Sequence, residues 1–132
     1  MSKVIAMSDH NYDLIRMLFE RWNAHDVEHV YGLFADGYRE YFNGVLVKNG
    51  RSDALEADRF LYDTISDYRA EIDDLYAGEH GAALRWRFIG TGPAGSFELP
   101  VASFYRVAQG SIVECWQYGD SVANAHALGL DQ

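Results

Sequence analysis

Four carboxylates are the side chains of this sequence best suited to acid–base chemistry: Glu40, Asp58, Glu98 and Asp120. Glu40 stands in the aromatic stretch YREYFN at residues 38–43, and Asp120 ends the stretch VECWQYGD. A carboxylate walled by apolar side chains loses hydration, which raises its pKa and suits it to proton transfer near neutral pH. Whether one of these groups is catalytic therefore depends on which of them faces the protein interior.

The alternation of residues 38–43 leaves two orientations open for Glu40. Glu40 shares strand parity with Phe42, so a pocket that receives Phe42 also receives the carboxylate, whose charge is then desolvated. In the opposite orientation Tyr41 and Asn43 face inward and Glu40 is solvated. We predict Glu40 as the candidate base, with Tyr41 as a second catalytic group and Asn43 as a ligand-binding partner.

Asp120 lies where an apolar alternating run ends, and this position also has two explanations. Aspartate is common at such ends because it turns the chain or caps a following segment. Alternatively, Asp120 is a catalytic acid at the mouth of a pocket. Glu98 stands close to Pro100, which suits an edge or bulge, and we expect it on a solvated face.

Aromatic side chains supply the candidate ligand-binding surface. They make up 14% of the chain, which favours an apolar or planar ligand, since pocket walls are mostly apolar with few polar groups. Each one is also explained by core packing. The candidates for the pocket lining are Trp22, Phe42, Tyr62, Trp86 and Phe104.

Composition and charge exclude several functional classes. Eleven Lys and Arg against twenty Asp and Glu give a net charge of −9, which repels nucleic acid and anionic membrane surfaces. The single cysteine, Cys115, lies in an apolar run and is expected to be buried and inert, and no Cys/His spacing resembles a zinc site. The opening residues MSKVIAMSDH are too short an apolar segment for a signal peptide or membrane span. We therefore expect one soluble, cytoplasmic domain over residues 1–132.

Three helices are predicted in the first half of the chain. Asp9 is a candidate cap for a helix that ends near Asn23, and Asp26 for a second helix that stops at Gly37. Residues 38–43 read as a strand, and GVLVKNGRS after them reads as a loop. The spacing of Asp53 and Glu56 is that of a capping box and predicts a third helix.

From residue 68 to residue 119 the apolar period changes from 3.6 to 2. Four alternating runs follow one another, separated by the glycine-containing turns GEHG, GTGPAG and AQG. Leu84 and Trp86 alternate with Arg85 and Arg87, so one sheet face is buried and the guanidinium face points outward. The predicted class is α+β, with three N-terminal helices packed on one side of a strongly curved, mostly antiparallel sheet.

Two stretches carry a resemblance to a known family. FERWNAHDVEHVYGLFADGYREYFNG at residues 19–44 is similar to the opening of the SnoaL-like polyketide cyclase branch of the nuclear transport factor 2-like superfamily, with N-x-x-D, then L-F-A, then an aromatic strand. GSIVECWQYGDSVANAHALGL at residues 110–130 is similar to its closing pattern, G-x-I-x-E-x-W and a terminal L-G. The resemblance implies a cone-shaped fold that also hosts ketosteroid isomerases, epoxide hydrolases and binding modules.

The same resemblance implies a pocket inside the cone that works without metal or organic cofactor. The base of the isomerases matches Phe42 here, which disfavours their mechanism. The essential aspartate of the cyclases and epoxide hydrolases matches Gln117, which keeps hydrogen bonds but is not a base. Tyr41 and Asn43 match residues that hold a water molecule in the epoxide hydrolases.

These observations predict a cofactor-independent protein that acts by proton transfer on a small, apolar, oxygenated or cyclic molecule. Cyclisation, isomerisation and hydration or hydrolysis are the reaction types considered, with Gln117 among the ligand-binding groups. The alternative is a non-catalytic ligand-binding or assembly module that has lost the family acid at position 117. In both cases we expect a homodimer, because an open cone leaves its outer sheet face uncovered.

Overall fold

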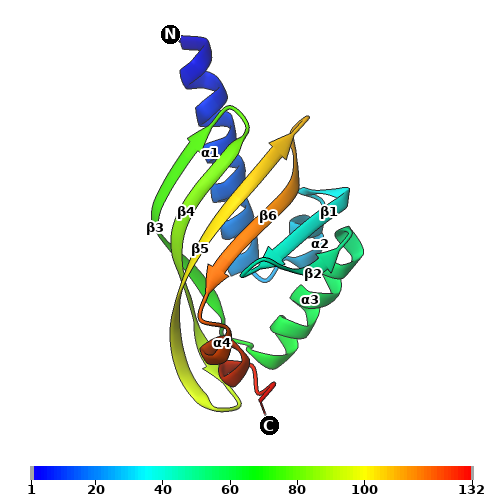
Figure 1. Cartoon of the computed structure of the whole chain (residues 1–132), viewed down its shortest axis with the longest axis vertical. Helices are drawn as coiled ribbons and strands as arrows, with labels where there is room; N and C mark the ends of the chain where they lie inside the picture. The colour runs from blue at the N-terminus through cyan, green and yellow to red at the C-terminus, as the bar shows by residue number, and fades with distance from the viewer. Residues whose placement is uncertain (1, 132) are drawn as a thin grey trace.

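The computed structural model describes residues 2–131, with side chains from residue 9 onward (Figure 1). Helices α1 (Ser2–Asn23) and α2 (Val27–Tyr31) open the chain, and the hairpin of β1 (Phe34–Phe42) and β2 (Val45–Asn49) follows. Helix α3 (Arg51–Thr64) precedes four strands, β3 (Arg69–Gly78), β4 (Gly81–Gly92), β5 (Gly95–Ala108) and β6 (Ser111–Gly119). A short helix, α4 (Ser121–Ala127), comes last.

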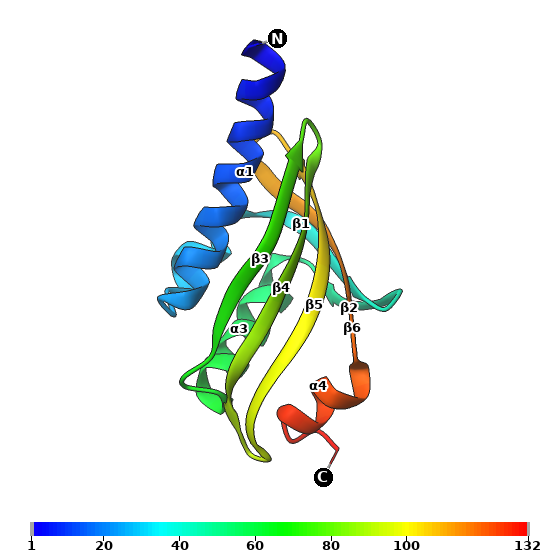
Figure 2. The same ribbon diagram turned by 90° about the vertical axis from the view of Figure 1, so that its left-hand side faces the viewer.

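All six strands form one curved, open sheet with the order β2-β1-β6-β5-β4-β3. Every neighbouring pair is antiparallel except β1 and β6, which run parallel. The two views show α1 and α3 on the same side of the sheet, with α4 at its lower end (Figures 1 and 2). The α+β prediction, with helices on one side of a curved and mostly antiparallel sheet, is confirmed.

Alternation in the last four strands determines which side chains face the helices. On β4, Leu84, Trp86 and Phe88 are buried, and they pack in the same core as Ile15 and Phe19 of α1. Burial of such large apolar side chains contributes about 1.5–3 kcal/mol each, which holds the helices on this face of the sheet. The predicted meander and its inward-facing residues are confirmed.

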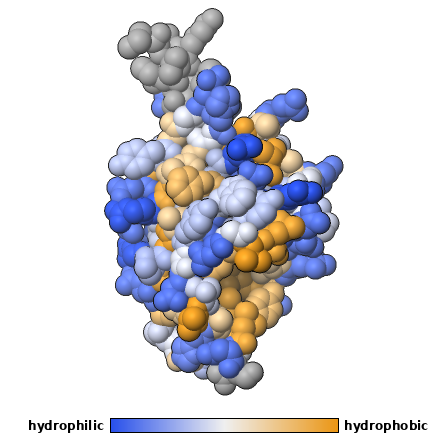
Figure 3. Space-filling view, in the orientation of Figure 1, coloured by the Kyte–Doolittle hydropathy of each residue, from blue (hydrophilic) through white to orange (hydrophobic). Residues whose placement is uncertain are grey.

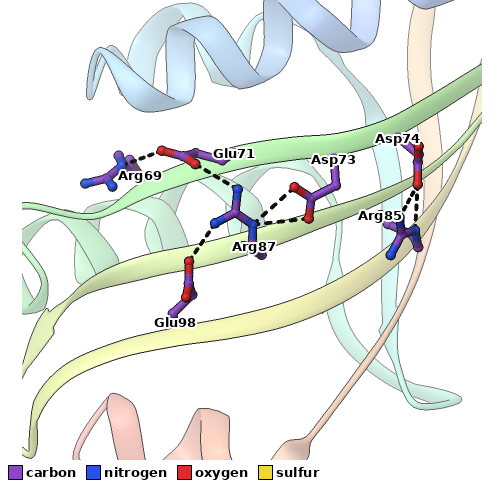
Figure 4. Close-up of polar contacts among 7 residues, drawn as sticks. All are labelled: Arg69, Glu71, Asp73, Asp74, Arg85, Arg87 and Glu98. Carbon is purple, nitrogen blue, oxygen red and sulfur yellow. Dashed lines mark hydrogen bonds and ion pairs between the residues drawn. The ribbon is translucent and has the colours of Figure 1, made fainter.

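The arginines of β4 lie on the opposite face, as predicted. Arg87 forms ion pairs with Glu71, Asp73 and Glu98, at 2.9, 3.1 and 2.6 Å (Figure 4). Arg85 pairs with Asp74 on the neighbouring strand. Because these groups are solvated and screened, each pair adds little stability, and their main effect is to keep this part of the outer face polar.

Several predicted boundaries in the first half of the chain are wrong. Asp9 lies inside α1 rather than at its start. Helix α2 ends at Tyr31 with Gly32 as its C-cap, and Gly37 lies within β1 and stops no helix. Helix α3 is capped by Gly50, and Asp53 accepts a hydrogen bond from the backbone N–H of Asn49 at 2.8 Å instead of opening the helix.

The predicted loop after residue 43 contains a strand. Asn43 and Gly44 both have positive φ, at 50° and 84°, which is the conformation that a tight two-residue hairpin turn requires. The turn reverses the chain and pairs β2 with β1. An Asn-Gly pair is the strongest short signal for such a hairpin, and it was overlooked because the residues after it resemble a loop in composition.

Two further features concern the end of the chain and its helices. Asp120 caps α4 by accepting a hydrogen bond from the N–H of Ala123 at 3.0 Å, which is one of the two explanations that the sequence left open for it. In the part of the chain that the structure describes, no helix combines the length and the apolar character needed to cross a bilayer.

Candidate functional site

A cavity of about 520 Å³ lies between the concave face of the sheet and helices α1 and α3. Its mouth is bordered by Val47 of β2, Phe60 of α3 and residues of α4 and the segment after it, among them Asn124 and Leu130. Apolar side chains surround a hollow in the lower half of the face shown in Figure 3. The volume and the apolar walls suit a small organic molecule.

Glu40 is the carboxylate that β1 places in this cavity, with 8% of its surface exposed. The hydroxyl of Tyr38 donates to Glu40 Oε1 at 2.7 Å, and the Nζ of Lys48 lies 3.0 Å from Oε2. Burial and then the charge of Glu40 raise the pKa of Tyr38 well above its usual value, so the hydroxyl remains a donor. Both oxygens of Glu40 are therefore engaged by groups of the protein.

The β1–β2 hairpin explains why Lys48 meets Glu40. The two residues stand directly opposite each other in the antiparallel register, and the register shifts at the next residue, Tyr41. Cross-strand neighbours on one face lie close enough for an ion pair. The tight turn at Asn43 and Gly44 thus places the ammonium group on the same inner face as the carboxylate.

Asp58 approaches the same end of the cavity from α3. It is 9% exposed, and its Oδ1 accepts a hydrogen bond from Trp22 Nε1 at 3.3 Å. Burial raises the pKa of Asp58 above its ordinary value; the charge of Lys48 counteracts this shift, and the charge of Glu40 adds to it. Because its pKa is raised, the buried carboxylate of Asp58 accepts a proton more readily than an ordinary aspartate side chain.

Lys48 lies between the two carboxylates, with one-fifth of its side chain exposed. Burial alone lowers the pKa of Lys48, but the charges of Glu40 and then Asp58 outweigh it, so the pKa lies above its usual value. The ammonium therefore stays charged at neutral pH. Two carboxylates and one ammonium leave this end of the apolar cavity with one excess negative charge when all three are ionised.

Five of the predicted site residues line the cavity: Trp22, Glu40, Phe42, Trp86 and Gln117. Trp86 Nε1 donates to Ser103 Oγ at 2.9 Å, so this indole is oriented by the sheet. Strand parity places Tyr38, Glu40 and Phe42 on the inner face, which is the first of the two orientations left open by the sequence.

Three predicted residues lie elsewhere. The ring of Tyr41 stacks on Trp116, with centroids 3.9 Å apart, on the outer face of the sheet. Phe104 is 52% exposed on the same outer face, because its strand parity is opposite to that of the buried Ser103. Tyr62 is exposed on α3 and packs edge-on against His25. None of the three lines the cavity.

The remaining two predicted residues have structural contacts at the rim of the sheet. The amide of Asn43 donates to the carbonyl of Gly119 at 2.8 Å and accepts from its N–H at 3.2 Å, tying the hairpin turn to the end of β6. Asp120 caps α4 and does not line the cavity, which agrees with the capping alternative. Cys115 is fully buried, and desolvation and then the charge of Glu40 raise the pKa of its thiol, as expected for an inert group.

Lys48 and the pairing of Asp58 with it were missed from the sequence. The Asn-Gly turn could have revealed Lys48, because it predicts a hairpin that reverses the chain beside Glu40. Asp58 shares the inner face of α3 with Ala54, four residues earlier, which is a helical spacing that the sequence does display. No local pattern in the sequence indicates that Asp58 and Lys48 lie close together in the folded chain.

Comparison with known proteins identifies the family. The model of the SnoaL-like domain matches residues 15–115. The chain belongs to the SnoaL-like domain family. No curated protein was found to match it.

Several solved structures share its fold. IdmH from Streptomyces antibioticus, a proposed polyketide cyclase, is 25% identical with a TM-score of 0.75, over 90% of this chain and 98% of IdmH. A proposed SnoaL-like polyketide cyclase from Jannaschia sp. CCS1 is 16% identical with a TM-score of 0.78, over 92% and 93% of the two chains. A Catenulispora acidiphila protein with a ketosteroid isomerase-like fold is 15% identical with a TM-score of 0.75, over 88% and 92%.

The polar groups of the cavity come from several elements. Its charged residues lie on β1, β2 and α3, and β6 supplies the neutral Gln117. Within residues 2–131, no three His, Cys, Asp or Glu side chains are grouped as a metal site would require. A desolvated carboxylate beside a fixed ion pair in an apolar cavity is suited to moving a proton on a neutral ligand.

Proposed function

We propose that this SnoaL-like protein catalyses proton transfer on a small, apolar, oxygenated or cyclic molecule, without a cofactor, by general acid–base chemistry. The observation that carries the proposal is the carboxylate of Asp58, buried at the polar end of the cavity beside the Glu40–Lys48 ion pair. Cyclisation, isomerisation and hydration all begin with such a proton transfer. Phe42 and Trp86 would contact the body of the ligand, and Gln117 would hydrogen bond to it.

Asp58 replaces Glu40 as the proposed base. Both Glu40 oxygens are already engaged, one by the Tyr38 hydroxyl and the other by the Lys48 ammonium. Asp58 accepts only the long bond from Trp22 among the side chains that the structure describes. Since an acid–base group works best with a pKa near the working pH, the raised pKa of Asp58 favours it for this role.

Deuterium exchange tests the proposed reaction without knowledge of the natural substrate. The protein is incubated in D₂O with cyclic ketones such as phenylcyclohexanone, and deuterium at the carbons next to the carbonyl is followed by NMR. We expect saturable exchange faster than in buffer, increasing with pH as Asp58 loses its proton. Ketone binding with exchange at the buffer rate would contradict the proposal and favour the non-catalytic binding module, for which Gln117 at the family acid position is the supporting observation.

We also propose that a second copy of this chain covers the outer face of the sheet. One row of directly opposed residues crosses all six strands there and is almost wholly apolar: Leu46, Tyr41, Trp116, Phe104, Ala83 and Tyr76. Arg106 and Glu114 border the row on one side, and Asp74 and Arg85 on the other. Charges of both signs around an apolar centre make the face complementary to itself, which a two-fold dimer needs.

Replacing Phe104 with Glu is expected to convert this dimer to monomer, because the charge would be buried at the centre of the contact. Light scattering during gel filtration measures the mass, which should fall from twice 14.9 kDa to 14.9 kDa. Val122→Glu is the matched control, since Val122 is 78% exposed on α4. A monomeric wild-type protein would refute this part of the proposal.

A cytoplasmic location and a single domain stay predictions.

A further inference from the structure

The Lys48 ammonium has more hydrogen-bond donors than the protein uses. An ammonium carries three N–H donors, and Glu40 Oε2 is the partner of one, at 3.0 Å. Among the side chains of residues 9–131, no other hydrogen bond to Nζ occurs, and Lys48 lines the cavity. Two of its N–H donors are therefore available to a ligand in the cavity.

The surroundings of Lys48 restrict what those donors can bind. The walls of the cavity are mostly apolar, with Leu18, Phe88 and Val101 among the lining residues. Glu40 and Asp58 together already exceed the charge of Lys48 by one. A ligand carboxylate would add a second excess negative charge in an apolar cavity, whereas a neutral carbonyl oxygen accepts hydrogen bonds without this cost.

We propose that Lys48 binds the carbonyl oxygen of a neutral ketone-type ligand, so that the carbon beside the carbonyl faces Asp58. This inference rests on the proposed proton-transfer function and adds the group that recognises the ligand. It also explains why a lysine is held charged inside the cavity between two carboxylates, where Glu40 fixes its position.

The resulting proton transfer is balanced. Asp58 accepts a proton from the carbon next to the carbonyl, so a C–H bond breaks and an O–H bond forms on the carboxyl group. The electron pair moves onto the carbonyl oxygen, and the Lys48 ammonium stabilises the enolate by a charge-assisted hydrogen bond. Asp58 then returns the proton to carbon, or the enolate carbon attacks a second carbonyl and Asp58 protonates the new alkoxide.

Selective ¹⁵N labelling of lysine gives a direct observation of this contact. The chain has two lysines, Lys3 and Lys48, so the Lys3→Met variant leaves one Nζ signal to assign. The probes are phenylcyclohexanone, the hydrocarbon phenylcyclohexane and the matching carboxylate. We expect the ketone to shift the Lys48 Nζ signal, the hydrocarbon to leave it in place, and the carboxylate to bind more weakly than the ketone at pH 8.

A double variant that leaves the net charge unchanged tests ketone binding by Lys48 with less risk that the protein fails to fold. Glu40→Gln with Lys48→Met removes both partners of the ion pair, so Glu40 is not left as an unpaired buried charge, and Asp58 stays as the charged group of the cluster. Ketone affinity should fall roughly 10- to 100-fold in this variant, the value of a hydrogen bond to a charged group, while hydrocarbon affinity is unchanged.

The outcomes separate this inference from the proposed function. Equal ketone affinity in wild type and double variant, or an Nζ signal that the ketone does not move, would overturn the role of Lys48 even if Asp58-dependent exchange persists. A ketone-specific Nζ shift without deuterium exchange would support the binding site and refute the catalytic step alone.

Discussion

The Asp58→Asn variant is expected to exchange the protons of a bound ketone about 10²- to 10⁴-fold more slowly than wild type, the contribution typical of a positioned acid–base group. Asn has nearly the shape of Asp and accepts the same hydrogen bond from Trp22, but it cannot take a proton at neutral pH. Initial rates of deuterium incorporation measure the effect, and ketone affinity should change little by comparison.

The same substitution is expected to stabilise the fold at pH 7. The pKa of Asp58 is higher in the folded protein than its ordinary value of 3.8, so the folded state binds the proton more tightly than the unfolded state. The contribution of Asp58 to the stability of wild type therefore falls as the pH rises from about 3.8 through the folded pKa, and the ionised group destabilises the protein above that window. Asn does not ionise and avoids this loss.

Urea unfolding of both proteins across this range provides the check, with Asp63→Asn as a control on the exposed face of the same helix. We expect the midpoint of Asp58→Asn to exceed that of wild type at pH 7, and the difference to shrink as the pH falls. An Asp58→Asn protein with wild-type exchange rates would exclude Asp58 as the base. Loss of both exchange and stability would indicate a structural role instead.

Lys48→Met alone is expected to lower the free energy of unfolding by about 3 kcal/mol at pH 7, because it leaves Glu40 buried without its counter-ion. Tyr38 still donates one hydrogen bond to the carboxylate but supplies no charge. The Glu40→Gln/Lys48→Met double variant should regain part of this loss, since the charge of Glu40 is no longer buried, while Asp58 still lacks the attraction of Lys48. Denaturant titration of wild type, Glu40→Gln, Lys48→Met and the double variant measures the coupling energy between Glu40 and Lys48.

The contribution of Lys48 should also depend on pH at the alkaline end. Its pKa is raised in the folded protein, so its stabilising effect is complete below the ordinary value of 10.5 and is lost as the pH rises through the folded pKa. The stability difference between wild type and Lys48→Met is therefore expected to narrow above about pH 10.5. If Lys48→Met and the double variant have equal free energies of unfolding at pH 7, the predicted cost of burying Glu40 without its counter-ion is wrong.

Local patterns in the sequence predicted the sheet better than the site. The alternation of Leu84 and Trp86 with Arg85 and Arg87 determined the inner and outer faces of β4, because a strand has only two faces. The aromatic and charged residues of β1 alternate in the same way, yet either parity was compatible with the sequence. Packing of Tyr38 into the core, where it is fully buried, selected the orientation that brings Glu40 inside.

The residues that line the cavity could not be predicted from any single helix or strand. Phe104 was predicted to line it because it is aromatic, and Tyr41 was predicted to act in it because it matches a water-holding residue of the epoxide hydrolases. Neither signal distinguishes an inner face from an uncovered outer one. In the structure both lie in the apolar row on the outer face, which gives them an alternative role in contact with a second chain. Asp120 had a capping signature, and this local interaction forms as the sequence indicates.

By itself, the sequence determined the order of most elements, the inner face of the meander, the membership of the family and the neutral residue at position 117, because these depend on spacing and residue type along the chain. Only the tertiary structure decided that Glu40, Lys48 and Asp58 form one charged cluster. They stand on β1, β2 and α3, and they meet because the Asn43–Gly44 turn folds β2 onto β1 and the core packs α3 across the sheet. Electrostatic coupling depends on distance and burial, and both are properties of the folded chain.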